Sequence, residues 1–165
     1  MSGLFTVRRA GGADVPSMFR IFNSELDDYF APETLEWSMM QWPAGQLVAV
    51  SFTGETAGAI NSYIIEEGTV SLALFAVDRR YRGRGAGSAL LDALVFACRG
   101  AGMHRIQLEA RVENASAIAF YSRRGFVRSC DLPGLYSNGG DGVRMVLNLG
   151  SSSAAGTPPW KRAPL

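Results

Sequence analysis

The sequence predicts a single α+β domain with a mixed sheet, whose elements follow the order β-α-α-β-β-β-α-β-α-β-β. Three observations predict it. Short segments in which apolar and polar residues alternate, as in half-buried strands, are separated by segments with apolar residues at helical spacing. Residues 70–77 are almost wholly apolar, as expected for a central strand. A chain of 165 residues without an internal repeat suits one domain with a sizeable core.

The helices and strands follow from local signals in chain order. Capping residues, apolar spacings of three and four, and glycine stops predict the helices. They are expected at residues 15–26 behind an Asp14 N-cap, at 34–41, at 85–99, and between an Asn114 N-cap and Gly125. Alternation and turn residues predict the strands. These are expected at residues 4–8, 47–52, 57–65, 70–77 and 104–112, from residue 126, and at 143–149.

The last sixteen positions have a different composition from the rest. Residues 1–149 are expected to form the folded domain. From residue 150 the chain is rich in serine, alanine, glycine and proline, a composition that cannot build a core. Residues 150–165 are therefore expected to be a flexible C-terminal tail.

Composition excludes several classes of function. A formal net charge of +1 gives no strong electrostatic case for a nucleic-acid partner. Two cysteines and one histidine, none at metal-ligand spacing, argue against a zinc site and against any metal requirement. No apolar stretch is long enough for a signal peptide or a membrane span, so no membrane association is expected. Without a disulfide framework, the expected location is the reducing cytoplasm.

The stretch Arg-Gly-Arg-Gly-Ala-Gly at residues 82–87 is the strongest functional signal. Its glycines leave backbone N–H groups bare for an anion, and the helix that follows adds its positive dipole end. A nucleoside-triphosphate loop would need Gly-Lys-Ser/Thr, but Lys161 is the only lysine in the chain. A dinucleotide loop would need Gly-x-Gly-x-x-Gly, which neither Gly83 nor Gly85 begins. The stretch therefore predicts another phosphate-bearing ligand.

The remaining pattern, Arg-x-x-Gly-x-Gly, resembles the GNAT family of acyl-CoA-dependent N-acetyltransferases. A second motif carries the same resemblance: Asn114-x-x-Ala117-x-x-x-Tyr121, followed by Gly125-Phe126. The resemblance covers about residues 4–149. It implies the GNAT fold, a mixed, mostly antiparallel sheet of six to seven strands with helices on both faces.

The resemblance also implies the donor and its site. In the family the loop holds the pyrophosphate of acetyl-CoA, the second motif lines the pantetheine arm, and the strand before the loop pairs with the pantetheine amides. A backbone N–H near Val77 would polarise the acetyl carbonyl. The donor-binding residues implied for this chain are Phe75, Ala76, Val77, Arg82, Gly83, Arg84, Gly85, Ala86, Gly87, Ser88, Asn114 and Tyr121.

Two side chains are expected to carry the proton transfers. Coenzyme A leaves as a thiolate whose conjugate acid has a pKa near that of a cysteine, roughly 8.5, and a phenol of pKa about 10 can donate a proton to it. Tyr121 is the predicted acid; the alternative is a core tyrosine. Glu109 is the predicted base, acting directly or through a water. The alternatives for Glu109 are a solvated strand carboxylate or an ion pair with Arg111.

The acceptor follows from a narrower resemblance. Residues 108–114 and 134–142 are similar to segments of protein N-terminal acetyltransferases of the ribosomal-protein alanine and archaeal types, which implies a polypeptide α-amine as acceptor. Partners would then be protein or peptide N-termini, with an auxiliary subunit or a homodimer as further possibilities. A small amine (polyamine, amino acid or aminoglycoside) and a catalytically idle acyl-CoA-binding module are the alternatives. The implied acceptor-binding residues are Asp27, Tyr29, Phe30 and Tyr136.

Overall fold

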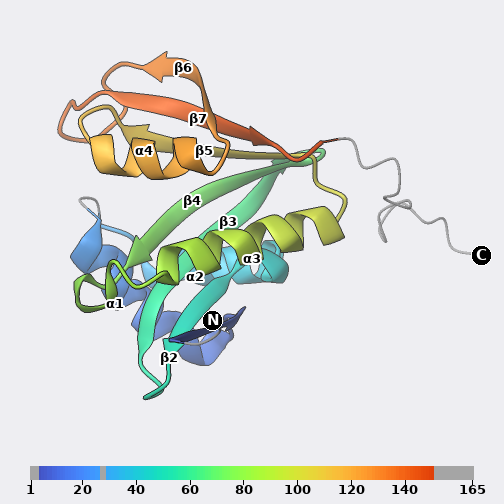
Figure 1. The fold of residues 1–165 in the computed structure, drawn as a ribbon, viewed down its shortest axis with the longest axis vertical. Helices are drawn as coiled ribbons and strands as arrows, with labels where there is room; N and C mark the ends of the chain where they lie inside the picture. Colours follow the sequence, from blue (N-terminus) through green and yellow to red (C-terminus); the bar gives the residue numbers. More distant parts are fainter. Residues whose placement is uncertain (1–3, 27–28, 151–165) are drawn as a thin grey trace, which may run out of the picture.

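The computed structural model describes residues 4–26 and 29–150. Within these ranges a seven-stranded sheet has the order β1-β2-β3-β4-β5-β7-β6 (Figure 1). The expected tail, apart from Gly150, lies outside the described residues. The strands are β1 (Phe5–Arg9), β2 (Leu47–Ser51), β3 (Thr56–Glu66), β4 (Thr69–Val77), β5 (Arg105–Arg111), β6 (Val127–Leu132) and β7 (Gly142–Asn148). The α-helices are α1 (Val15–Glu25), α2 (Pro32–Gln41), α3 (Ala86–Gly100) and α4 (Ala115–Arg123).

The strand pairing confirms the predicted fold class. Neighbouring strands are antiparallel except β4 and β5, which run parallel. This parallel pairing covers only residues 69–71 of β4 and 105–107 of β5. Beyond it the two strands diverge, which Figure 1 shows as the opening between β4 and the upper part of the sheet. Each strand keeps its other neighbour, β3 or β7, so the sheet opens without losing its remaining pairs.

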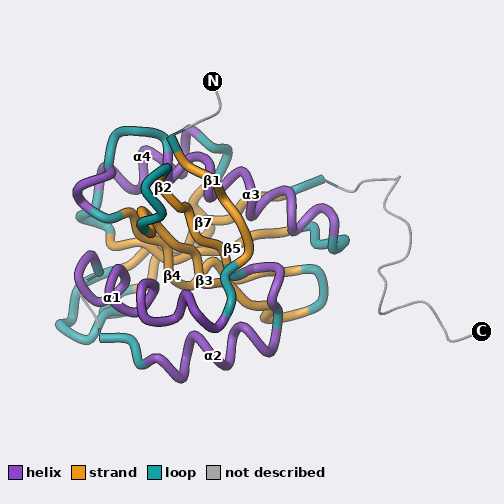
Figure 2. The backbone as a smooth tube through the Cα atoms, turned by 90° about the horizontal axis from the view of Figure 1, so that it is seen from below, coloured by secondary structure: helices purple, strands orange, loops and turns teal. Residues whose placement is uncertain are grey.

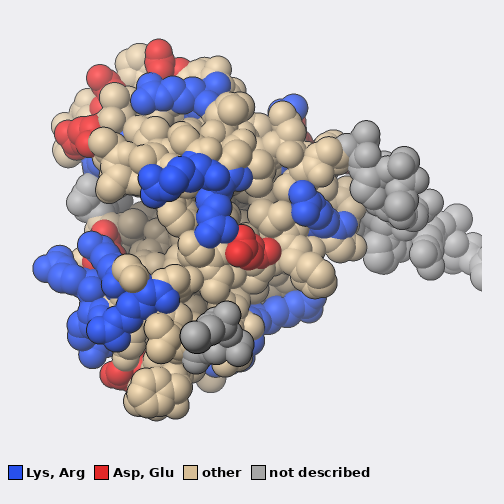
Figure 3. Space-filling model, in the orientation of Figure 1, with Lys and Arg blue, Asp and Glu red and all other residues tan. Residues whose placement is uncertain are grey.

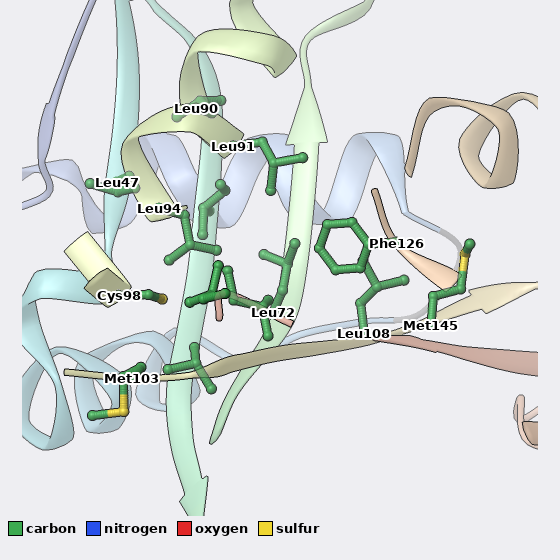
Figure 4. Close-up of a cluster of buried hydrophobic side chains, with 14 of the residues drawn as sticks. Leu47, Leu72, Leu90, Leu91, Leu94, Cys98, Met103, Leu108, Phe126 and Met145 are labelled. Atoms are coloured by element: carbon green, nitrogen blue, oxygen red, sulfur yellow. The ribbon is translucent and has the colours of Figure 1, made fainter. Parts of the chain in front are cut away.

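Helices cover both faces of the sheet, as Figure 2 shows. On one face α1 and α2 bury a small cluster that includes Met18, Phe22 and Leu35. On the other face α3 and α4 cover the larger cluster. Figure 4 shows side chains of that cluster from both sides of the opening: Leu72, Leu90, Leu91 and Leu94 on the β4 side, and Leu108, Phe126 and Met145 on the β5 side. Burial in this cluster raises the pKa of the Cys98 thiol to about 12, so Cys98 is a core residue and no nucleophile.

The predicted boundaries agree with the structure to within two residues. The largest difference is at the second helix, which starts at Pro32 rather than at residue 34. Proline lacks an N–H and has a fixed φ, so it suits the first position of a helix. In the described ranges no helix is long and apolar enough to cross a bilayer.

Asp14 occupies the predicted N-cap position of α1, but its side chain does not cap the helix. The Asp14 side chain makes no capping hydrogen bond to α1. Its carboxylate instead binds the Arg8 guanidinium at 2.8 and 2.9 Å and accepts the Gly11 N–H at 2.7 Å. Chiefly through the Arg8 hydrogen bonds, the pKa of Asp14 lies below its usual value of 3.8. The carboxylate thus ties β1 to the start of α1.

We expect Asp14→Asn to lower the free energy of unfolding by about 1 kcal/mol at pH 7. Because the Asp14 pKa is lower in the folded state, its charge stabilises the fold above pH 3.8 and loses this effect as the pH falls through the folded pKa. Urea denaturation at pH 7 and pH 3 should therefore show a difference that shrinks in acid. Asp92→Asn, which removes a 70% exposed partner of Arg124, should change stability less at both pH values.

Candidate active site

The diverging edges of β4 and β5 form a cleft of about 970 Å³. Residues 72–77 of β4 and 108–111 of β5 have no strand partner across this opening. Apart from the carbonyls of Arg111 and Val77, which accept hydrogen bonds from Asn114 and Arg82, their backbone groups toward the opening are available to an extended ligand. Such a ligand would pair as an added strand pairs with a sheet edge. Both segments line the cleft.

The hydrogen bonds at the end of β4 indicate which backbone groups face the cleft. The Asp78 N–H donates to the Ala57 carbonyl of β3, at 2.8 Å. Since successive residues of a strand alternate between its two edges, the backbone groups of Phe75 and Val77 face the cleft, whereas those of Ala76 face β3. The Val77 carbonyl accordingly accepts the Arg82 Nε–H at 3.3 Å. Of the donor-binding residues predicted on β4, Phe75 and Val77 therefore turn their backbone groups to the cleft, and Ala76 does not.

The predicted anion loop lies at one end of the cleft. Gly83 and Gly85 have φ values of +74° and +90°, which side chains rarely adopt. Gly85 is the N-cap of α3 and supplies no side-chain hydrogen bond, so the first-turn N–H groups of α3 have no capping side chain among the described residues. Gly87 lines the same end of the cleft, and a Cβ there would make an ordinary contact with the Phe75 ring at 3.5 Å.

Most of the loop lines the cleft, including Arg82, Ala86 and Ser88, but Arg84 is exposed and does not. Figure 3 shows basic side chains gathered at this end of the molecule, beside the hollow between the upper and lower halves of the view. Uncapped N–H groups, a helix dipole and nearby guanidinium groups together favour an anion.

Asn114 has the predicted capping role. Its Oδ1 atom accepts the Ala117 N–H at 3.2 Å at the start of α4. The Ser116 hydroxyl donates to the same oxygen at 3.1 Å. All three residues line the cleft, so the asparagine positions the start of α4 along its wall.

Tyr121 lies in an aromatic group that lines the cleft from α4. Its ring centroid is 5.5 Å from those of Phe120 and Phe126 and 6.2 Å from that of Phe75. Burial, with a smaller effect of Tyr136, raises the pKa of the Tyr121 phenol well above its usual value of 10.0. The phenol is therefore protonated at neutral pH, and its hydroxyl donates to no residue that the structure describes. It is available as a proton donor to a ligand in the cleft.

Glu109 lines the cleft from β5 but faces the opposite side of the sheet from α4. Leu108 and Ala110 belong to the core beneath α3 and α4, and alternation along the strand turns Glu109 to the other face. Its Oε1 atom accepts the Arg144 Nε–H at 3.1 Å and the Gln107 amide at 3.3 Å. Its Oε2 atom accepts no hydrogen bond from the described residues, so one oxygen is anchored and the other can receive a proton.

The predicted alternative of a Glu109–Arg111 ion pair is wrong. Arg144 is the cross-strand partner of Glu109 on β7. The Arg111 guanidinium instead lies 4.0 Å from the centre of the Tyr136 ring and donates to Asn138 Oδ1 at 3.2 Å. Arg111 therefore holds the segment between β6 and β7 against the cleft.

Of the predicted acceptor-binding residues, the structure brings Phe30 and Tyr136 to the cleft. Tyr29 is 73% exposed, packs on Phe19 at 5.9 Å and does not line the cleft. Asp27 lies outside the described residues. Asn23 accounts for the position of Phe30, because its amide accepts the Phe30 N–H and donates to the Phe30 carbonyl.

Two charged residues near the cleft escaped prediction. Glu25 lines the cleft from the end of α1 and binds Arg82, and Arg144 anchors Glu109. Both contacts join distant segments, so no motif or short spacing signals them. In the described part of the chain no group of three metal-ligating side chains comes together.

A sheet that opens at a parallel strand pair, next to the uncapped N-terminus of a helix, has the architecture of acyltransferases that take their acyl group from a coenzyme A thioester. Sequence comparison gives the same class. A model of the Acetyltransferase (GNAT) family matches residues 15–126, and the chain belongs to that family.

Comparison with individual proteins shows which members of the family the chain is similar to. The chain is 31% identical over 142 residues to N-alpha-acetyltransferase MAK3 of Arabidopsis thaliana, which covers 84% of this chain and 74% of the relative. Among solved structures, Ard1 from Thermoplasma volcanium superposes with a TM-score of 0.84 at 32% identity, over 88% of this chain and 98% of that one. A NatC complex bound to Gag peptide and CoA shares the fold, with a TM-score of 0.82, 21% identity, and 87% and 98% coverage.

Proposed function

We propose that this protein transfers the acetyl group of acetyl-CoA to the α-amino group of protein or peptide N-termini. The observation that carries the proposal is the cleft between β4 and β5, which has the predicted anion loop at one end and a protonated phenol and a carboxylate along its walls. Membership of the GNAT family supports the reaction, and similarity to an N-alpha-acetyltransferase over most of the chain supports the acceptor.

The donor fits the residues that line the cleft. The N–H groups of Ala86 and its neighbours at the start of α3, with Arg82 nearby, suit the pyrophosphate. The unpaired edge of β4 offers backbone groups of Phe75 and Val77 to the pantetheine amides. Tyr121 would face the thioester sulfur.

The two faces of the sheet suggest how the substrates meet. The donor would occupy the side of α3 and α4, and the acceptor amine would enter from the side of Glu109 and Tyr136. In direct attack, the amine nitrogen forms a bond to the acetyl carbon and the carbon–sulfur bond breaks. Tyr121 would protonate the departing thiolate, and Glu109 would take the proton released by the amine. No covalent enzyme intermediate is required.

Mass spectrometry of a peptide library incubated with the protein and acetyl-CoA tests the proposal directly. We expect a mass gain of one acetyl group on the α-amine, which fragment ions locate. A parallel panel of polyamines, amino acids and aminoglycosides serves as the comparison. Turnover of those amines without any acetylated peptide would refute the peptide acceptor.

Glu109→Gln should lower kcat/KM for a peptide about fivefold at pH 7 and have little effect at pH 9. An α-amine has a pKa of roughly 7.7–8.0, so at pH 7 most of it is an ammonium that Glu109 must deprotonate before attack, whereas at pH 9 most of it is already neutral. Steady-state kinetics at both pH values measure the change. Glu113→Gln, which removes an exposed carboxylate just after β5 that does not line the cleft, controls for the loss of a negative charge. An equal loss at both pH values would mean that Glu109 positions the substrate instead.

The cellular setting and partners are further parts of the proposal. Cys98 and Cys130 are both free, as suits a reducing cytoplasm. The proposed protein partner is an auxiliary subunit or a second copy of the chain, since a protein of the same fold occurs in the NatC complex.

A further inference from the structure

Glu25 joins the end of α1 to the anion loop. It is the last residue of α1, and its side chain is only 8% exposed. Its carboxylate accepts a hydrogen bond from the Arg82 guanidinium and, at 3.3 Å, from the backbone N–H of Arg79. A nearly buried carboxylate thus connects two segments that lie more than fifty residues apart in the sequence.

Arg82 has donors left for a second anion. Its Nη2 atom donates to Glu25, and its Nε atom donates to the Val77 carbonyl. Its Nη1 atom makes no hydrogen bond to any residue in the described ranges, and its side chain is 54% exposed. A guanidinium presents five N–H donors in a planar fork, so it can hold a carboxylate along one edge and a phosphate along another.

Charge favours this bridged arrangement over an exchange of partners. If Arg82 left Glu25 for a phosphate, a nearly buried carboxylate would lose its counter-charge beside a new anion. A guanidinium between the two anions avoids that repulsion. A bound pyrophosphate would therefore hold Arg82, and through it Glu25, more firmly in place.

The residues next to Glu25 lie on the acceptor side of the cleft. Leu26 and Phe30 both line it. The Leu26 N–H donates to the Phe22 carbonyl at 3.0 Å, and the Phe30 N–H donates to Asn23 Oδ1 at 2.8 Å, so both are attached to α1. Fixing Glu25 fixes the end of the helix from which both are held.

We propose that Glu25 is a positioning residue that couples donor binding to acceptor binding. Coenzyme A held by Arg82 restrains Glu25 and the end of α1, which orders the acceptor side and raises its affinity for the peptide. By linkage, the peptide raises the affinity for coenzyme A by the same factor. The identity of the acceptor rests on the function proposed above.

Calorimetric titration of an acceptor peptide, with and without saturating coenzyme A, tests the coupling. Coenzyme A carries no acetyl group, so nothing reacts. In the wild type we expect it to tighten peptide binding at least about fivefold. In Glu25→Gln, coenzyme A should tighten peptide binding less than about twofold. In steady-state kinetics of this variant, kcat at saturation should stay within about threefold of the wild type, and the loss of activity should appear as a higher KM for the peptide. Glu36→Gln, an exposed carboxylate on α2, is the matched control.

A second variant distinguishes the planar geometry of the Arg82 guanidinium from its positive charge. Arg82→Lys keeps a positive charge beside Glu25 but lacks the planar fork, so it should fold normally and lose the coupling. A Glu25→Gln protein that retains the wild-type gain would overturn the proposal.

Amide exchange separates failure of the coupling from failure of the proposed function. If the wild type binds no peptide, the proposed function fails. Hydrogen exchange at the Leu26 and Phe30 amides then still measures whether bound coenzyme A restrains the end of α1 through Glu25. Coenzyme A should slow exchange at both amides in the wild type and not in Glu25→Gln. Equal slowing in both proteins would refute the role of Glu25.

Discussion

Tyr121→Phe is expected to lower kcat at least about tenfold while leaving the affinity for acetyl-CoA almost unchanged. The variant removes only the hydroxyl, which the proposed mechanism uses to protonate the departing thiolate. A tenfold loss corresponds to about 1.4 kcal/mol of transition-state stabilisation. Steady-state kinetics with a peptide acceptor, together with calorimetric titration of coenzyme A, separate kcat from binding.

The variant should fold normally. The Tyr121 hydroxyl makes no hydrogen bond to the described residues, so phenylalanine leaves no buried partner unsatisfied, and the ring keeps its contacts with Phe75, Phe120 and Phe126. Tyr63→Phe is the matched control, since Tyr63 packs on Trp37 away from the cleft. An unchanged kcat in Tyr121→Phe would remove Tyr121 from the acid role and leave it as part of the cleft wall.

The raised pKa of Tyr121 also bears on the pH dependence of the reaction. Because burial raises that pKa above 10.0, the phenol stays protonated across the range in which an α-amine loses its proton. The rate should therefore rise with pH through the titration of the acceptor amine, without a fall at pH 9 from loss of the acid.

The parts of the site that sequence predicted are those encoded over a few consecutive residues. The positive φ angles of Gly83 and Gly85 follow from a glycine loop between a strand and a helix. The cap formed by Asn114 follows from a polar residue just before an apolar helical pattern. Local signals of this kind also gave the order of the elements, and hence the fold class.

The parts that sequence did not predict depend on which segments meet in space. Asp14 stands at the N-cap position of α1, but its carboxylate binds Arg8 on β1. The preference of N-caps for aspartate considers only the residues next to the helix, so it does not include this ionised partner. Glu109 and Arg111 are two residues apart on one strand, yet the register of β5 against β7 places Arg144 opposite Glu109. The contact between Glu25 and Arg82 spans 57 residues and needs the full fold.

Gly85→Val is expected to weaken the binding of coenzyme A at least about tenfold. A Cβ at Gly85 would project from the N-cap of α3 into space that no described atom occupies within 4 Å, which is where the pyrophosphate is proposed to lie. The side chain would keep the phosphate away from the first-turn N–H groups. Calorimetric titration of coenzyme A measures the loss.

A valine at this position also strains the backbone, and Gly54→Val controls for that strain. Gly54 lies in the turn between β2 and β3 and does not line the cleft. Its φ is +89° against +90° for Gly85, and a Cβ there also meets no atom within 4 Å. Both variants should therefore lose similar stability, about 1–2 kcal/mol, and show similar falls in Tm. Only Gly85→Val should lose affinity for coenzyme A. Wild-type binding in Gly85→Val, or an equal loss in Gly54→Val, would show that the loop does not hold the pyrophosphate.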